Sequence, residues 1–427
     1  MKQVGCWQLP NGMMLYYMAG GSTFNVSGVG FTNAGSINDP PGKVGLAHAT
    51  EHMLARASRK YTLDEVDLMC WKYMGGPDDD VDIRTAHTNV YFGHGELYQR
   101  YKMNAVFDMM ASFVHPKTRL ITPVDFLSEK GAVHQETYLR GTDVIQEVLD
   151  DYLRKTLYAR NPARNRIDCD VDHLRTMTTR DVRRFVDRYY VPKNGFIILF
   201  GPKPEAAKAM AMQYFGDWEE ARTPIFDYDH SDDVPRVSGV LSKEIELPGS
   251  HQYHVGVAFP TETFSTENGE ALDFLACILE MRLMTKLRDE NSNMEAGVYR
   301  TPVYIERTKV HGMISASFAT IDKDFAKRAE EVMVQEFRGL TADLVRPEEF
   351  DAIGFRLLDE YRNALRNDGA ALSEMVIDAI SNGDTYLQQF VATPERIKGV
   401  TRRKLRTVAN KYFSSKNGYA RVLIKPA

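Results

Sequence analysis

Within the segment Gly45–Ala57, two histidines and a glutamate stand within five residues of one another. If the segment is helical, His48 and His52 project from one face about one turn apart, because residues four apart are neighbours on a helix. Two neutral imidazoles at that spacing can bind one Zn²⁺ at about 2.0–2.1 Å. Glu51 could then take a proton from a water molecule activated by the metal. The alternative is a solvated helix face that carries two histidines and a surface charge.

An acidic pair further along the chain could complete such a site. A catalytic zinc needs a third protein ligand and an open fourth position. Glu129 and Glu136 are seven residues apart in the helix-like segment 123–141, and therefore share one helix face. One of them could bind the metal while the other orients a histidine or holds the water. The spacing alone leaves open which glutamate does which.

These two segments resemble the signature of the pitrilysin/insulinase family of zinc metallopeptidases. GLAHATEHML is similar to that family's inverted motif HxxEH, and EKGAVHQE is similar to its downstream segment with two glutamates. The resemblance implies Zn²⁺ ligands at His48, His52 and Glu136. It also implies a general base at Glu51 and a supporting role for Glu129.

A segment of the second half also resembles the family. RLMTKLRDENSNMEAGVYRTP is similar to a family segment in which an arginine and a tyrosine reach the substrate near the zinc. Arg288 matches the arginine, and Tyr299 matches the tyrosine with a longer spacing. Both side chains could stabilise the oxyanion of a tetrahedral intermediate. The alternative is that they pack at a helix end and in a strand.

An internal repeat predicts two related domains. Residues 178–202 and 401–426 share a basic helix, a Lys-Asn-Gly turn and an apolar strand. We predict an N-terminal zinc-binding domain at 1–215, a polar linker at 216–239 and a related domain without metal ligands at 240–427. In both halves strands precede long helices. This order favours an α+β fold with antiparallel sheets packed against helices over a doubly wound parallel sheet.

The composition narrows the class of protein. The chain has 427 residues, of which 43% are hydrophobic and 26% charged, as in globular proteins with large cores. Its net charge of −5 indicates no basic surface for nucleic acid. No apolar run reaches the roughly 18 residues of a membrane span. Because the N-terminus lacks the apolar core of a secretory signal, we expect a cytoplasmic protein. The four dispersed cysteines fit reduced thiols.

We therefore expect a zinc metalloendopeptidase or oligopeptidase that hydrolyses peptides or unfolded segments. The resemblance implies a dimer of identical chains or of two related subunits. It also implies that an extended substrate pairs with an edge strand in the segment 75–92. The main alternative is a non-catalytic scaffold or partner subunit of the same fold. A structural zinc fits less well, because such sites normally have four protein ligands and are often rich in cysteine.

Overall fold

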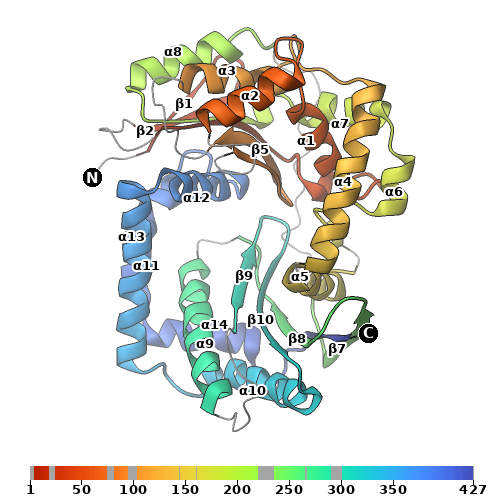
Figure 1. The fold of residues 1–427 in the computed structure, drawn as a ribbon. Helices are drawn as coiled ribbons and strands as arrows, with labels where there is room; N and C mark the ends of the chain where they lie inside the picture. Colours follow the sequence, from red (N-terminus) through yellow and green to blue (C-terminus); the bar gives the residue numbers. More distant parts are fainter. Residues whose placement is uncertain are drawn as a thin grey trace. The chain divides into compact units, whose positions relative to one another are not determined.

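The computed structural model describes residues 4–18, 25–74, 81–94, 103–143, 145–159, 161–219, 235–264, 267–289 and 301–426. The chain forms two compact units, and each unit contains segments from both halves of the sequence (Figure 1). The first unit comprises Met1–Thr137, Asn165–Asp227 and Glu360–Val391, and the second comprises Tyr138–Arg164, Tyr228–Asp359 and Ala392–Ala427. Relative to the predicted division at 215 and 240, residues 138–164 belong to the second unit and residues 360–391 to the first. Compact units of the structure are not the same as domains of the sequence, and the predicted domain bounds stay a prediction.

The first unit is built on a mixed sheet. In the described residues its strand order is β1-β2-β6-β3-β5-β4. The strands are β1 (Gly5–Gln8), β2 (Met14–Met18), β3 (Val26–Thr32), β4 (Val81–Thr85), β5 (Asn89–His94) and β6 (Gly195–Phe200). Only the β2–β6 pair of these strands is parallel. Strand β4 therefore lies at an edge of the sheet, and its inner side pairs with β5.

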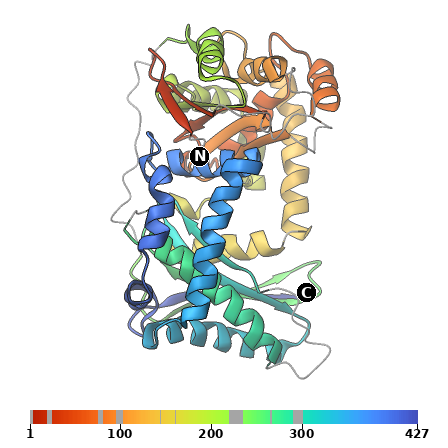
Figure 2. The same cartoon turned by 90° about the vertical axis from the view of Figure 1, so that its left-hand side faces the viewer.

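Helices cover both faces of this sheet (Figure 1 and Figure 2). One core contains residues of α1 (Leu46–Ala55), α2 (Leu63–Tyr73), α3 (Met103–Val114), α4 (Pro123–Asp143), α6 (Val171–Thr176), α7 (Thr179–Tyr189) and α8 (Pro204–Phe215). The opposite core contains residues of α12 (Gly369–Ser381). Along β6, Ile197 and Leu199 enter the first core while Phe196 and Ile198 enter the second. Burial on both faces explains why β6 reads as a continuous apolar run.

The second unit repeats this plan. Its strand order is β7-β11-β8-β10-β9 in the described residues. The strands are β7 (Val240–Leu247), β8 (Tyr253–Pro260), β9 (Val303–Arg307), β10 (Gly312–Thr320) and β11 (Tyr419–Pro426). Residues of α9 (Gly269–Asp289), α10 (Lys323–Ala342), α11 (Pro347–Asn367), α13 (Gln388–Gly399) and α14 (Arg402–Phe413) form one core. Residues of α5 (Ile145–Leu157) form another.

The two sheets correspond strand by strand, apart from the additional β1. Strand β6 is parallel to β2 and antiparallel to β3, and β11 is likewise parallel to β7 and antiparallel to β8. Each strand of the repeat follows a helix capped by a threonine: Thr178 accepts from the Asp181 amide, and Thr401 accepts from the Lys404 amide. The predicted α+β fold is confirmed. The prediction of antiparallel sheets is wrong in one respect: each sheet is mixed, because the last strand of each repeat pairs in parallel with an earlier strand of the same sheet, β6 with β2 and β11 with β7. No helix in the described ranges is both long and apolar enough to cross a membrane.

Candidate metal centre

Helix α1 carries the HxxEH residues and is buried along most of its length. The side chain of His48 is buried, and Glu51 is only 6% exposed. The interpretation of this segment as a solvated helix face is therefore wrong. Burying a carboxylate or an imidazole costs free energy unless the group is paired or binds a cation. The burial of His48 and Glu51 therefore indicates that each has a partner or a bound cation.

The first turn of α1 is held by a buried carboxylate that the sequence did not reveal. Asp39 accepts hydrogen bonds from the amides of Gly45 at 2.6 Å and Ala47 at 2.8 Å. Burial raises the pKa of Asp39 to about 8, although these amides counteract the increase. Gly45 has a φ of 89°, and a Cβ there would lie 2.3 Å from Cys169 Cα. These contacts hold the start of the helix that carries His48.

Helix α4 brings the two glutamates toward α1. Phe126 and Val133 of α4 are buried in the core, and Glu129 and Glu136 lie on the same side of the helix. Lys130 ties α4 to the end of α6 by donating to the carbonyls of Arg175 at 3.0 Å and Met177 at 3.1 Å. The predicted shared face of the two glutamates therefore points at the metal-binding motif.

Three potential ligands meet between these helices. The Nε2 atoms of His48 and His52 are 3.2 Å apart. Glu136 Oε2 lies 2.9 Å from His52 Nε2 and 3.5 Å from His48 Nε2. Ligand atoms about 2.0–2.1 Å from a tetrahedral Zn²⁺ are separated by about 3.3 Å. The donor set therefore fits zinc, and among the described residues it is the one His/Cys/Asp/Glu group with this capacity.

The charges around these atoms favour a cation. Burial lowers the pKa of His52, but the carboxylates of Glu129 and Glu136 outweigh burial and raise this pKa to about 10. Contacts with His48 and His52 hold the pKa of Glu136 far below its usual range. The cluster thus stabilises positive charge between the imidazoles and the carboxylate, where a divalent ion would supply it.

Glu129 has a different set of contacts from Glu136. Its Oε2 lies 3.7 Å from His52 Nδ1, on the side of the ring opposite the ligand atom, and its Oε1 accepts from Arg56. Arg56 Nε also lies 3.4 Å from Asp125 Oδ1. Burial would raise the pKa of Glu129, but His52 and Arg56 keep it below its usual range. Glu129 is placed to orient His52, and Arg56 is a supporting contact that sequence reasoning missed.

Glu51 faces the end of the edge strand β4. Thr85 Oγ1 donates to Glu51 Oε2 at 3.0 Å, and both side chains are buried. The i, i+3 spacing puts Glu51 one turn after His48, beside the three ligand atoms. A carboxylate in this position can act as a proton acceptor without being a metal ligand. Sequence reasoning missed Thr85 because it is 34 residues from Glu51 in the chain, and only the packing of β4 against α1 brings the two side chains together.

Comparison with protein-family models assigns both halves of the chain to one family. The model described as Insulinase (Peptidase family M16) matches residues 23–171, which include the HxxEH motif and both glutamates. The model described as Peptidase M16 inactive domain matches residues 176–356. This chain belongs to the M16 (insulinase) peptidase family.

Two curated M16 relatives are zinc proteases by name. The chain is 26% identical to the probable zinc protease PqqL of Haemophilus influenzae over an alignment 310 residues long, which covers 69% of this chain and 33% of the relative. It is 20% identical to the zinc protease PqqE of Helicobacter pylori over 246 residues, which are 57% of this chain and 53% of the relative. The chain thus spans about a third and about half of the lengths of these two relatives.

Solved structures share the M16 fold over the whole chain. A protease from Helicobacter pylori matches with a TM-score of 0.87 and 17% identity, covering all of both chains. A peptidase M16 inactive domain from Pseudomonas fluorescens matches with a TM-score of 0.82 and 16% identity, covering 100% of this chain and 98% of the other. The periplasmic protease PqqL from Escherichia coli matches with a TM-score of 0.74 and 14% identity, covering 99% of this chain and 48% of the other.

The predicted arginine–tyrosine pair of this M16 chain lies in the second half. Arg288 is in the last turn of α9, in the second unit, with an exposed side chain. Tyr299 lies outside the described residues. The structure therefore brings together His48, His52 and Glu136, with Glu51 and Glu129 beside them. The assignment of Arg288 and Tyr299 to the site stays a prediction.

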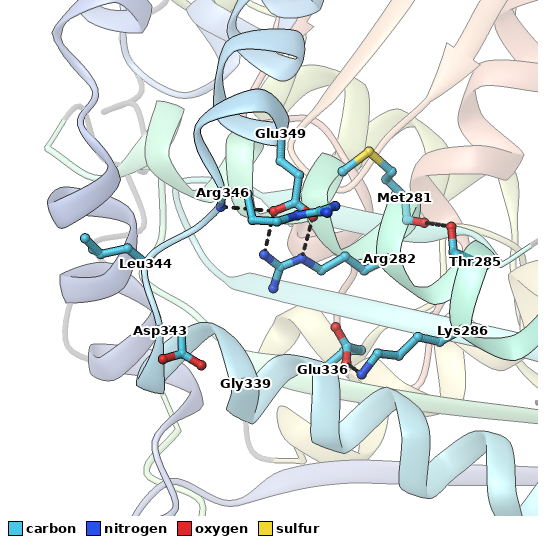
Figure 3. Close-up of a pocket in the computed structure, with 10 residues that line it drawn as sticks. All are labelled: Met281, Arg282, Thr285, Lys286, Glu336, Gly339, Asp343, Leu344, Arg346 and Glu349. Atoms are coloured by element: carbon cyan, nitrogen blue, oxygen red, sulfur yellow. Dashed lines mark hydrogen bonds and ion pairs between the residues drawn. The ribbon is translucent and has the colours of Figure 1, made fainter. Parts of the chain in front are cut away.

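A cavity of about 570 Å³ in the second unit offers no comparable chemistry (Figure 3). Two charged pairs lie in it: Arg282 makes a two-pronged contact with Glu349 at 3.1 and 2.7 Å, and Lys286 pairs with Glu336. These pairs join α9 to α10 and α11. The cavity is thus a structural charge network rather than a second catalytic site.

We predict that Arg282→Met destabilises the second unit by about 1.5–3 kcal/mol, because the buried Glu349 loses its stronger partner. Arg346→Met should destabilise the unit less than Arg282→Met does, because the Arg346 side chain is 73% exposed and solvent screens its contact with Glu349. Burial would raise the pKa of Glu349, but the two arginines lower it to about 2. Its contribution to stability is therefore present above about pH 4.3 and is lost as the pH falls toward 2.

Chemical denaturation of the parent and both variants between pH 7 and pH 3 checks this prediction. The free energy of unfolding should differ less between pH 7 and pH 3 in Arg282→Met than in the parent. In Arg346→Met most of the parental difference should remain. Equal unfolding midpoints for Arg282→Met and the parent at pH 7 would contradict the assigned role of the pair.

Proposed function

We propose that this M16 chain is a zinc-dependent endopeptidase or oligopeptidase that hydrolyses peptides or unfolded segments. The observation that carries the proposal is the convergence of His48 Nε2, His52 Nε2 and Glu136 Oε2 at separations suited to a tetrahedral metal. The zinc-protease names of the curated relatives support it. The metal ligands would come from α1 and α4, two helices held in one core.

Glu51 would perform the proton transfers. A bound zinc ion would polarise the scissile carbonyl and lower the pKa of water from 15.7 to about 7. Glu51 accepts the proton as the water attacks and delivers it to the leaving amine. Its Oε1 accepts no hydrogen bond from any side chain in the described ranges, whereas Oε2 is bonded to Thr85. The carboxylate thus has one oxygen held and one available to exchange a proton.

The substrate would bind as an extended strand beside β4. This strand lies at the sheet edge, and its last residue, Thr85, contacts Glu51. A peptide paired with β4 would present its backbone next to the metal ligands. Main-chain hydrogen bonds would provide affinity with modest dependence on sequence. This arrangement favours unfolded or extended peptides over folded proteins, which do not offer a free strand.

We propose that two chains of this size form the complete enzyme, either as a homodimer or with a related subunit. The chain covers 48% of the E. coli PqqL chain and matches the structure of the first half of that protein at a TM-score of 0.72. A second chain would correspond to the remaining half. A related second chain could supply the arginine–tyrosine pair that the family resemblance assigns to Arg288 and Tyr299.

The test is metal analysis of the purified chain combined with cleavage of an internally quenched peptide. We expect about one zinc per chain, cleavage that chelation abolishes, and recovery when zinc is restored. Zinc binding without cleavage would favour the alternative of a non-catalytic scaffold or partner subunit. That alternative is supported by the Pseudomonas fluorescens structure described as an inactive domain, but the complete HxxEH motif and Glu136 favour the enzyme.

The cytoplasmic location also stays a prediction. One protein of the same fold, PqqL from E. coli, is described as periplasmic. Fractionation of cells that make the chain from its own gene would distinguish the two compartments.

A further inference from the structure

We propose that Thr85 is a positioning residue for Glu51 and couples peptide docking on β4 to orientation of the proton acceptor. The inference rests on the proposed peptidase function and adds a residue to it. Its starting point is the 3.0 Å hydrogen bond from Thr85 Oγ1 to Glu51 Oε2. No other side chain in the described part of the chain donates to Glu51.

Burial of both side chains protects this hydrogen bond from competition with water. Thr85 is 9% exposed and Glu51 is 6% exposed, so water cannot readily replace the hydroxyl as a donor. A hydrogen bond to a charged acceptor is stronger in such surroundings than in water. The contact therefore restricts rotation of the carboxylate and leaves Oε1 as the oxygen that exchanges a proton.

The alternation of β4 explains why this threonine can serve both roles. Thr85 and Ile83 face the core that contains α1, whereas Arg84 faces the other side and donates to Glu374 of α12 at 2.7 Å. The backbone of Thr85 pairs with Val90 of β5 on its inner side. Its outer side is the edge along which a peptide would add. One residue thus joins the docking edge to the general base.

The test compares Thr85→Val, which removes the hydroxyl at nearly constant shape, with Thr85→Ser, which keeps it. In the zinc-loaded protein we expect Thr85→Val to lower kcat about 10- to 100-fold, with KM changed less than about twofold. Zinc content should equal that of the parent, and Thr85→Ser should recover most of kcat. A general structural defect would not be rescued by serine in this way.

Thr50→Val is the matched control. Thr50 is the neighbour of Glu51 on α1, is fully buried, and its hydroxyl has no hydrogen-bond partner in the described residues. The same substitution there should leave kcat and KM at parental values. Parental kcat for Thr85→Val, or equal losses in Thr85→Val and Thr85→Ser, would overturn the inference while leaving the peptidase proposal intact.

A second readout does not depend on activity. In metal-free protein, introducing Thr85→Val into the parent should lower the Tm by about 2–4 °C. Introducing it into the Glu51→Leu variant should lower the Tm by under about 1 °C, because the carboxylate that Thr85 contacts is already absent there. If the parent does not cleave peptides, the proposed function fails, but the double-mutant cycle of Thr85→Val and Glu51→Leu still tests whether the two side chains interact. Additive Tm shifts then overturn it, and non-additive shifts support it.

Discussion

Glu51→Gln should retain zinc and lose about 10²–10⁴-fold in kcat for peptide cleavage, the range that general acid–base catalysis contributes. Glutamine has nearly the same shape, and its carbonyl can still accept the hydrogen bond from Thr85. It cannot accept a proton from water at neutral pH. The variant therefore separates proton transfer from metal binding and folding.

The measurement is cleavage of an internally quenched peptide, with zinc content and thermal unfolding recorded on the same samples. Glu205→Gln is the matched control, because it removes the same charge from an exposed position in the first turn of α8. It should cleave at the parental rate. Undiminished turnover by Glu51→Gln would show that Glu51 takes no part in the reaction.

Glu136→Gln should weaken zinc binding by more than about 100-fold, which exceeds the usual effect of changing a residue that only supports a ligand. The substitution removes a negative charge and an anionic donor 2.9 Å from His52 Nε2. Zinc at 1,000 times its Kd should stabilise the parent by about 4 kcal/mol, because the ion binds the folded state. The variant should lose most of this stabilisation.

His134→Ala is the control for the second experiment. His134 is an exposed residue of α4, two positions from Glu136 and on a different face. Titration of each metal-free protein with zinc, followed by thermal unfolding, distinguishes a ligand from a nearby histidine. If Glu136→Gln takes up zinc like the parent while His134→Ala does not, the predicted ligand set is incorrect.

Local spacing accounts for what could be predicted about the site. His48, Glu51 and His52 lie within two turns of one helix, so their relative directions follow from helix geometry. The same argument predicts a shared face for Glu129 and Glu136. The repeat at 178–202 and 401–426 predicts related sheets for the same reason, because a helix, a turn and a strand are local features.

The assignment of roles to the two glutamates required more than spacing. Both occupy one face of α4, and the residues alone left their roles open until the family resemblance favoured Glu136 as the ligand. In the structure Glu136 approaches the Nε2 atoms of both histidines, whereas Glu129 contacts Arg56 and the opposite side of His52. The difference arises from the packing of α1 against α4, which no pattern within either helix encodes.

The sequence by itself determined the HxxEH helix, the paired glutamates, the α+β class and the duplication. Each depends on contacts between residues close in the chain or on a repeated pattern. Only the tertiary structure decided that Asp39 holds the start of α1, that Thr85 meets Glu51, and that the segment 360–391 joins the first unit. An apolar or polar pattern predicts that a face will be buried or paired, but its partner is chosen by packing between elements distant in the chain.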